Sequence, residues 1–169
     1  MELIREIYHY EIDNKLANKK VKYEIRKAAR AILLNDKGEI AILHVTSDKY
    51  HKLPGGGIES NETVMKALYR EILEEVGAHI KVEDEIGIII EYRDLFQQLQ
   101  ISYVYLCKTQ GELEEPNFTE SEKNHGFRVK WMRVEDAISQ MQNDEPHNYM
   151  GKFINLRDLT LLLKYKNEI

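Results

Sequence analysis

The sequence has 169 residues, of which 43% are hydrophobic and 31% charged, and its formal net charge is −5 at pH 7. These values indicate one soluble domain with its own core, and the acidic balance gives no strong signal for nucleic-acid binding. No segment approaches the roughly 18 apolar residues of a membrane span, and the charged N-terminus does not resemble a secretory signal. We therefore expect a cytoplasmic protein.

The first 24 residues form a charged extension, for which we expect a strand, a short helix or an arm exchanged in a dimer. Residues 25–169 are expected to form the main domain. Its first two strands are predicted at 28–34 and 39–45, since both runs are apolar and a turn signal at 35–38 separates them. Residues 53–57 read Leu-Pro-Gly-Gly-Gly, which predicts irregular structure because breakers follow one another.

A helix is predicted over 62–76, with Ser60 or Asn61 as its N-cap and Gly77 as its C-terminal cap. Its apolar residues recur at helical spacing and predict one buried stripe. The stripe consists of Met65, Leu68, Ile72 and Val76.

Further strands are predicted at 86–92, 101–108 and 127–134, and further helices at 135–141 and about 149–166. The order lacks regular strand–helix alternation, which favours a mixed sheet with helices on its faces over a doubly wound parallel sheet. Cys107 lies in an apolar run and is expected to be a buried strand thiol.

The polar side of the predicted helix carries Glu71, Glu74 and Glu75, whose spacing makes their side chains neighbours. Like charges at this spacing repel each other, so the three carboxylates need an explanation. They form either a solvated helix face or a site for Mg²⁺, a hard cation that prefers several oxygen ligands.

The surrounding cassette favours a metal site. Residues 56–78 follow the spacing G-x5-E-x7-R-E-U-x-E-E-x-G-U, in which U is a bulky aliphatic residue. Ile72 fits the first U, while Ala78 is a weak match to the last. This cassette resembles the signature of the Nudix hydrolases (MutT-like). Its fixed letters are Gly56, Glu62, Arg70, Glu71, Glu74, Glu75 and Gly77.

The resemblance implies a Nudix-type α/β/α sandwich with a mixed β-sheet, and a site that binds Mg²⁺ or Mn²⁺. Glu71, Glu74 and Glu75 would hold one to three ions, together with backbone carbonyls of Gly55 or Gly56. Arg70 would be mainly a structural partner of Glu62 or of a ligand glutamate, and Gly77 would end the helix. Glu59 is a further acidic candidate beside the substrate.

Other candidates for the site lie outside the cassette. Many Nudix hydrolases carry an acidic residue in a later loop that binds metal or acts as base, and Glu120 and Glu122 in the 118–123 loop are the candidates here. Tyr92 and Arg93 end a predicted strand at a place where relatives often contact substrate, and Arg93 is a candidate for a terminal phosphate.

The implied reaction is metal-dependent hydrolysis of a phosphate–phosphate bond in a nucleoside diphosphate derivative, with a nucleoside di- or triphosphate favoured by elimination. A nucleotide sugar or a dinucleoside polyphosphate is the alternative within the class. A catalytically silent nucleotide-binding module and an isomerase on the same scaffold are alternatives of other classes; the isomerase expects a catalytic cysteine, for which Cys107 is a poor match. Relatives are often homodimers, so a homodimer is expected.

Overall fold

The computed structural model of the protein describes residues 1–13 and 20–168. Within them the chain forms eight strands, five α-helices and one 3₁₀ turn. The elements are β1 (Leu3–Tyr8), α1 (His9–Ile12), β2 (Glu24–Leu34), β3 (Ile40–Val45), β4 (Tyr50–Lys52), β5 (Gly55–Gly57), α2 (Val64–Val76), β6 (His79–Arg93), a 3₁₀ turn η1 (Asp94–Phe96), β7 (Gln98–Gln110), α3 (Glu120–Asn124), β8 (Phe127–Met132), α4 (Val134–Asn143) and α5 (Tyr149–Glu168).

The strands form one sheet in the order β1-β6-β7-β2-β3-β4, with β5 attached to β2 and β8 attached to β3. The pairs β1–β6 and β2–β7 are parallel, whereas the other pairs are antiparallel. The sheet is therefore mixed, as the sequence predicted.

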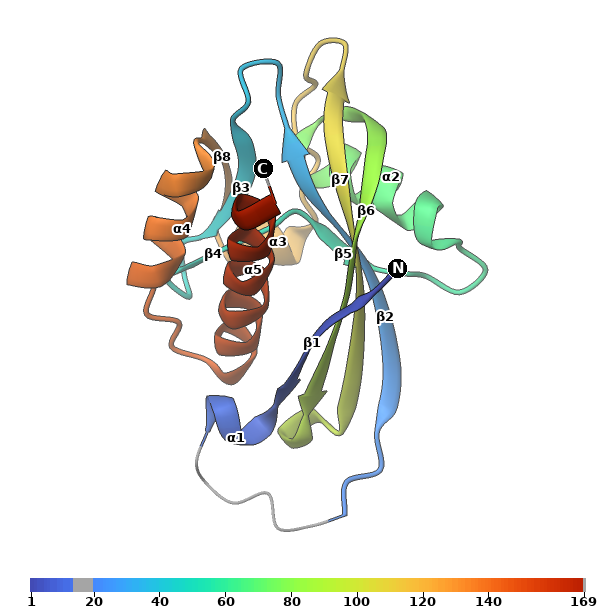
Figure 1. The fold of residues 1–169 in the computed structure, drawn as a ribbon, viewed down its shortest axis with the longest axis vertical. Coiled ribbons are helices and arrows are strands. Elements are labelled where there is room, and N and C mark those ends of the chain that lie inside the picture. The colour runs from blue at the N-terminus through green and yellow to red at the C-terminus, as the bar shows by residue number, and fades with distance from the viewer. Residues whose placement is uncertain (14–19, 169) are drawn as a thin grey trace.

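Helices cover both faces of this sheet, with α2 on one side and α4 and α5 on the other (Figure 1). Each face has its own hydrophobic core. Leu68, Ile72 and Val76 of α2 pack against Ala29 and Leu33 of β2 in one core. The other core joins α4 and α5 to the opposite face of the sheet. The predicted α/β/α sandwich is confirmed.

Residues of the predicted N-terminal extension form β1, which pairs in parallel with β6 at one edge of the sheet. Residues 14–19 of that extension lie outside the described residues. Gly87 lets β1 approach, because a Cβ at its φ of +143° would lie 2.7 Å from the carbonyl oxygen of Glu2. Of the structures expected for this segment, Leu3–Tyr8 forms a strand and His9–Ile12 forms a short helix, and a role as a dimer arm stays a prediction.

The prediction of irregular structure at 53–57 is wrong for its second half. Gly55–Gly57 forms β5, which pairs antiparallel with β2 and places Gly55 opposite Arg30. A Cβ on Gly55 would lie 2.3 Å from the carbonyl oxygen of Ala29. Here glycine does not break the strand, but permits a close backbone approach that a side chain would prevent.

The predicted N-cap of the long helix is also wrong. Asn61 has a φ of +69°, whereas an N-cap has extended backbone. Thr63 is the cap, and its hydroxyl accepts a hydrogen bond of 3.2 Å from the backbone N–H of Lys66. The C-terminal prediction is confirmed: Gly77 is left-handed (φ 69°), and its N–H donates to Leu73 O over 2.9 Å.

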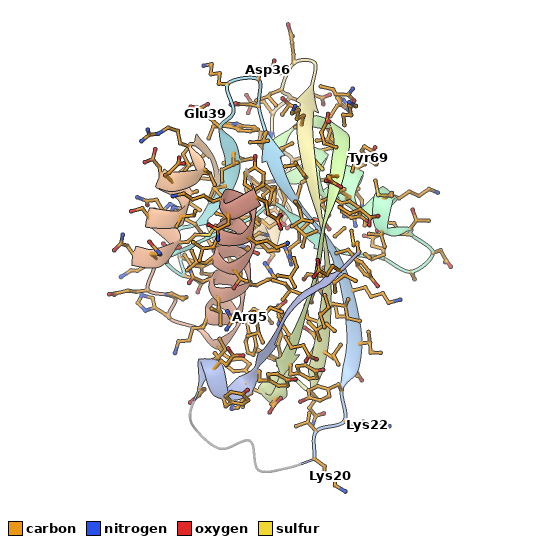
Figure 2. All side chains as sticks on the ribbon, viewed as in Figure 1. Arg5, Lys20, Lys22, Asp36, Glu39 and Tyr69 are labelled. Carbon is orange, nitrogen blue, oxygen red and sulfur yellow. The ribbon has the colours of Figure 1, made fainter. Side chains whose placement is uncertain are left out.

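The other predicted strands and helices are present with different ends, whereas the short strand β4 was not predicted. β6 and β7 are longer than expected because they pair along a continuous hairpin. The 118–123 segment, predicted as a loop, contains the short helix α3, since Thr119 and Glu122 form a capping box. Figure 2 shows Asp36 and Glu39 at the turn after β2 and Lys22 before its other end, so that β2 runs most of the length of the molecule.

Candidate active site

Arg70 organises the polar face of α2. Its Nε and Nη2 atoms donate to the two carboxylate oxygens of Glu62, each over 2.9 Å. Its Nη1 donates to Glu71 over 2.9 Å and to Glu74 over 3.2 Å. Nη2 also donates to the carbonyl oxygen of Gly57 over 3.0 Å, which ties the helix to β5. Arg70 therefore fixes two of the three clustered glutamates, and its hydrogen bonds lower the pKa of Glu62 to about 2.

Glu75 contacts the other end of β5, at Gly55. One carboxylate oxygen accepts from Lys52 Nζ over 2.8 Å, and the other accepts from the backbone N–H of Gly55 over 2.6 Å. The residue is 1% exposed, so this carboxylate is buried together with its cationic partner. The carbonyl oxygen of Gly55 in turn accepts from Arg30 over 2.8 Å.

Glu71 lies against Gly56, because a Cβ on that glycine would come within 2.4 Å of the carboxylate atoms. The missing side chain of Gly56 is thus the space that the Glu71 carboxylate occupies. Burial, and after it the neighbouring Glu75 carboxylate, raise the pKa of Glu71 above its ordinary value. A cation placed between Glu71 and Glu75 would relieve this repulsion.

The donor set fits a divalent metal ion of the Mg²⁺ type, since it consists of carboxylates and backbone carbonyls on a glycine turn. Glu71, Glu74, Glu75 and the carbonyl groups of Gly55 and Gly56 would hold it. As the side chains lie, Arg70 bridges Glu71 and Glu74 and Lys52 pairs with Glu75, and no three acidic, histidine or cysteine groups in the described part of the chain enclose an ion.

A cavity of about 450 Å³ opens next to these carboxylates. Its cationic lining residues are Arg26, Arg30, Lys52 and Arg93, and its acidic ones are Glu71, Glu75 and Glu122. Tyr50, Phe127, Met150 and Ile154 add aromatic and aliphatic walls. Of these side chains, the sequence predicted only Glu71, Glu75, Glu122 and Arg93 as site residues.

The two glutamates predicted in the later segment differ in position. Glu122 lines the cavity and accepts hydrogen bonds from the backbone N–H (2.8 Å) and the hydroxyl (2.9 Å) of Thr119. Glu120 has a side chain that is 85% exposed and pairs with Lys123 at the surface. The structure brings Glu122 to the cavity and leaves Glu120 in solvent.

Comparisons with known proteins identify the family of the chain. The family model described as NUDIX domain matches residues 24–153. The chain belongs to the Nudix family. The human diphosphoinositol polyphosphate phosphohydrolase NUDT4B is 32% identical over 124 residues, which make up 72% of this chain and 65% of that protein. The matched Nudix region of this chain thus spans less than two thirds of that relative.

Solved structures show the same Nudix fold at low sequence identity. The Ap4A hydrolase of C. elegans superposes with a TM-score of 0.60 at 16% identity, covering 86% of this chain and 98% of that one. The MutT protein of Methanosarcina mazei Go1 gives a TM-score of 0.58 at 17% identity, covering 89% and 100% of the two chains. None of the described helices of this Nudix chain is both long and apolar enough to cross a membrane.

Of the two candidates at the end of β6 in this Nudix domain, Arg93 lines the cavity and Tyr92 does not. Arg93 is 3% exposed, lines the cavity, and donates to Glu91 over 2.8 Å and to Gln98 over 3.0 Å. Tyr92 does not line the cavity; its hydroxyl donates to Glu6 over 2.7 Å, and its ring stacks on Tyr8. Alternate residues of a strand face opposite sides, which explains the separation.

Glu59 is exposed and its side chain is not part of the cavity lining. Its backbone N–H donates to Glu62 over 3.0 Å, so it supports the residue that orients Arg70. Cys107 lies fully buried in the core beneath α2, and burial raises its pKa to about 12. A protonated, enclosed thiol does not suit the nucleophile that an isomerase would need.

Arg157, Asp158 and Glu91 form a buried ionic network next to the residues that line the cavity. Arg157 of α5 donates to Asp158 over 2.6 Å and 3.0 Å and to Glu91 over 3.4 Å. Asp158 also accepts from the backbone N–H of Leu53 over 2.8 Å. The C-terminal helix therefore holds both the strand that carries Arg93 and the segment that leads into β5.

Proposed function

We propose that this Nudix domain hydrolyses a phosphate–phosphate bond in a small nucleoside diphosphate derivative and uses Mg²⁺ or Mn²⁺ to do so. The observation that carries the proposal is the Arg70 network, which binds Glu74 and holds Glu71 beside Gly56 at the edge of a cavity with cationic walls. A silent binding module has no need of this arrangement.

The residues of the cassette divide the work. Glu71, Glu74 and Glu75 provide carboxylates for a divalent cation, which when bound offsets the charge of the diphosphate and makes a water molecule more acidic. Arg70 orients Glu71 and Glu74 through hydrogen bonds, and Glu62 orients Arg70. Lys52 pairs with the buried Glu75 and lies at the wall that the substrate phosphates would meet.

Glu122 is the proposed proton acceptor. Its carboxylate lines the cavity, and its hydrogen-bond partner is the neutral residue Thr119 rather than a cation. Glu71 and Glu75, by contrast, are paired with Arg70 and Lys52. Among the described residues no cation pairs with Glu122, so its carboxylate is available to accept a proton from a water molecule in the cavity.

Aromatic walls support a nucleoside as part of the substrate. Tyr50 and Phe127 line the cavity and also a second one of about 550 Å³, to which Phe96 and Tyr149 contribute. Planar rings offer stacking surfaces for a base and make fewer favourable contacts with a fully phosphorylated ring. A nucleoside di- or triphosphate remains the first choice, with a nucleotide sugar or a dinucleoside polyphosphate as the alternative.

A second candidate substrate is a diphosphoinositol polyphosphate, which the name of the human relative suggests. The four cationic side chains in the cavity favour it, because such a ligand carries many negative charges. Two of the four are already paired with carboxylates, which lowers the charge available to the ligand.

The deciding experiment is a substrate panel with Mg²⁺ or Mn²⁺ that contains each of these classes, with products identified by ³¹P NMR. We expect turnover of a nucleoside diphosphate derivative, and a loss of about 100-fold or more in Glu75→Gln. No turnover of any diphosphate would refute the enzymatic function, and equal turnover by Glu75→Gln would refute the metal assignment. A cytoplasmic location and a homodimer stay predictions.

A further inference from the structure

Two arginines on β2 face the cavity and have no acidic partner among the described residues. Arg26 donates through Nη1 to the side-chain oxygen of Gln100 over 2.6 Å, and Arg30 donates through Nη1 to the carbonyl oxygen of Gly55 over 2.8 Å. Both acceptors are neutral. Arg30 is 5% exposed, and its Nε has no hydrogen-bond partner among the described residues.

The other cations of the cavity are arranged differently. Lys52 pairs with Glu75 over 2.8 Å, and Arg93 pairs with Glu91 over 2.8 Å. Behind them, Arg157 pairs with Asp158 and Glu91. Within the residues described, these carboxylates are thus engaged by other cations, and Arg26 and Arg30 form no ion pair of their own.

The positions of the two arginines place two unpaired positive charges at one cavity, which destabilises the protein when no anion is bound. They are four residues apart on a strand, so their side chains share one face. Burial, and then repulsion from Arg157, lower the pKa of Arg30 to about 10; burial, and then repulsion from Arg93, lower the pKa of Arg26. A buried cation that lacks a counter-charge is destabilising unless an anion arrives to balance it.

We propose that Arg26 and Arg30 form an anion subsite that binds a phosphate group of the substrate independently of the divalent cation. The two guanidinium groups line the same cavity as Glu71 and Glu75, but come from β2 rather than α2. The substrate diphosphate is then held from two sides, by cation-bound carboxylates and by these arginines. The inference rests on the proposed function for its choice of ligand.

The subsite also gives a reason for Gly57. A Cβ on Gly57 would lie 2.8 Å from Nη2 of Arg26, so the guanidinium packs directly over this glycine. Arg30 is similarly fixed by the carbonyl oxygen of Gly55. Both charged groups are therefore positioned by β5 before any ligand binds, which reduces the conformational entropy lost on binding.

The test is binding of inorganic pyrophosphate to the whole protein in the presence of EDTA, measured by calorimetry. We expect binding by the native protein, and at least about tenfold weaker binding by Arg26→Gln and by Arg30→Gln, since each variant loses a charged hydrogen-bond donor. Lys27→Gln is the matched control, because Lys27 lies exposed between them on β2 and loses the same charge. It should bind like the native protein.

Thermal unfolding gives a second readout that a purely structural role would not move. Pyrophosphate without metal should raise the midpoint for the native protein and for Lys27→Gln, and raise it less for Arg26→Gln. If Arg30→Gln fails to fold, Arg26→Gln alone decides, because Arg26 is only partly buried.

Failure of this inference can be told apart from failure of the proposed function. A native protein that hydrolyses diphosphates with Mg²⁺, but binds pyrophosphate without metal no better than Arg26→Gln does, overturns the subsite. A native protein that binds pyrophosphate through these arginines, but hydrolyses no diphosphate, supports the subsite and refutes the enzymatic function.

Discussion

Arg70 and Glu62 meet edge to edge, with Nε and Nη2 of the guanidinium each 2.9 Å from a separate carboxylate oxygen. Two parallel hydrogen bonds fix the plane of the guanidinium, which a single contact would not do. Nη1 is then left to face Glu71 and Glu74. Glu62 therefore acts on the candidate metal site through Arg70, although it does not belong to the ligand set.

Arg70→Lys tests this role. A lysine ammonium keeps the positive charge but cannot make the two-point contact with Glu62 and reach Glu71 at the same time. We expect diphosphate turnover to fall by about 10- to 100-fold, with a higher Mg²⁺ concentration needed for half-maximal rate. Steady-state kinetics over a range of Mg²⁺ concentrations measures both effects, and native-like values for the lysine variant would show that orientation by Arg70 is unimportant.

Acid should weaken the contribution of Glu62 to stability. Its pKa is lowered from 4.5 to about 2 in the folded protein, so the unfolded chain binds more protons between these values. The stabilisation is complete above pH 4.5 and is lost as the pH falls to about 2. Urea unfolding of native protein and Glu62→Gln should show a difference at neutral pH that shrinks across this window. A constant difference would contradict the assignment.

Gly56→Ala and Gly77→Ala make the same chemical change with opposite expected results. At Gly56 the new methyl group would displace the Glu71 carboxylate, which is the end of a side chain and not backbone, so turnover should fall while the unfolding midpoint changes little. At Gly77 it would lie 2.0 Å from the backbone oxygen of Glu114 at a φ of +69°. We expect the free energy of unfolding of Gly77→Ala to drop by about 1 to 3 kcal/mol. Thermal melts and kinetics on both variants separate the two effects.

Glu122→Gln and Glu120→Gln form another matched pair within α3. The first removes a carboxylate that lines the cavity, and we expect turnover to fall by about 100-fold with a changed pH–rate profile. The second removes a surface charge that is 85% exposed, and turnover should stay within about twofold. Equal effects in the two variants would mean that the proton acceptor lies elsewhere, most simply on α2.

The cassette could be predicted from sequence because its geometry is local. Glu71, Glu74 and Glu75 share one side of a helix through their spacing alone, and the glycines precede them at fixed offsets. The N-cap was harder to predict, since Ser60, Asn61 and Thr63 are all good capping residues. They differ in backbone conformation, and the left-handed Asn61 shows that the chain is still turning there.

The basic wall of the cavity could not be predicted in the same way. Lys52, Arg26 and Arg30 reach the cavity through strand pairing, and the register that sets Arg30 opposite Gly55 joins segments far apart in the sequence. One local signal was nevertheless present. Arg30 is a charged residue inside the apolar run at 28–34, and a charge in a buried strand usually has a specific partner or ligand.

The last helix sets the order in which this site can be completed during synthesis. Arg157 and Asp158 lie beyond residue 153, where the family match ends, yet they hold Glu91 and the backbone of Leu53. Met150 and Ile154 of the same helix supply part of the cavity wall. A nascent chain that already carries every glutamate of the cassette therefore has an incomplete cavity wall until α5 has left the ribosome and docked against the sheet.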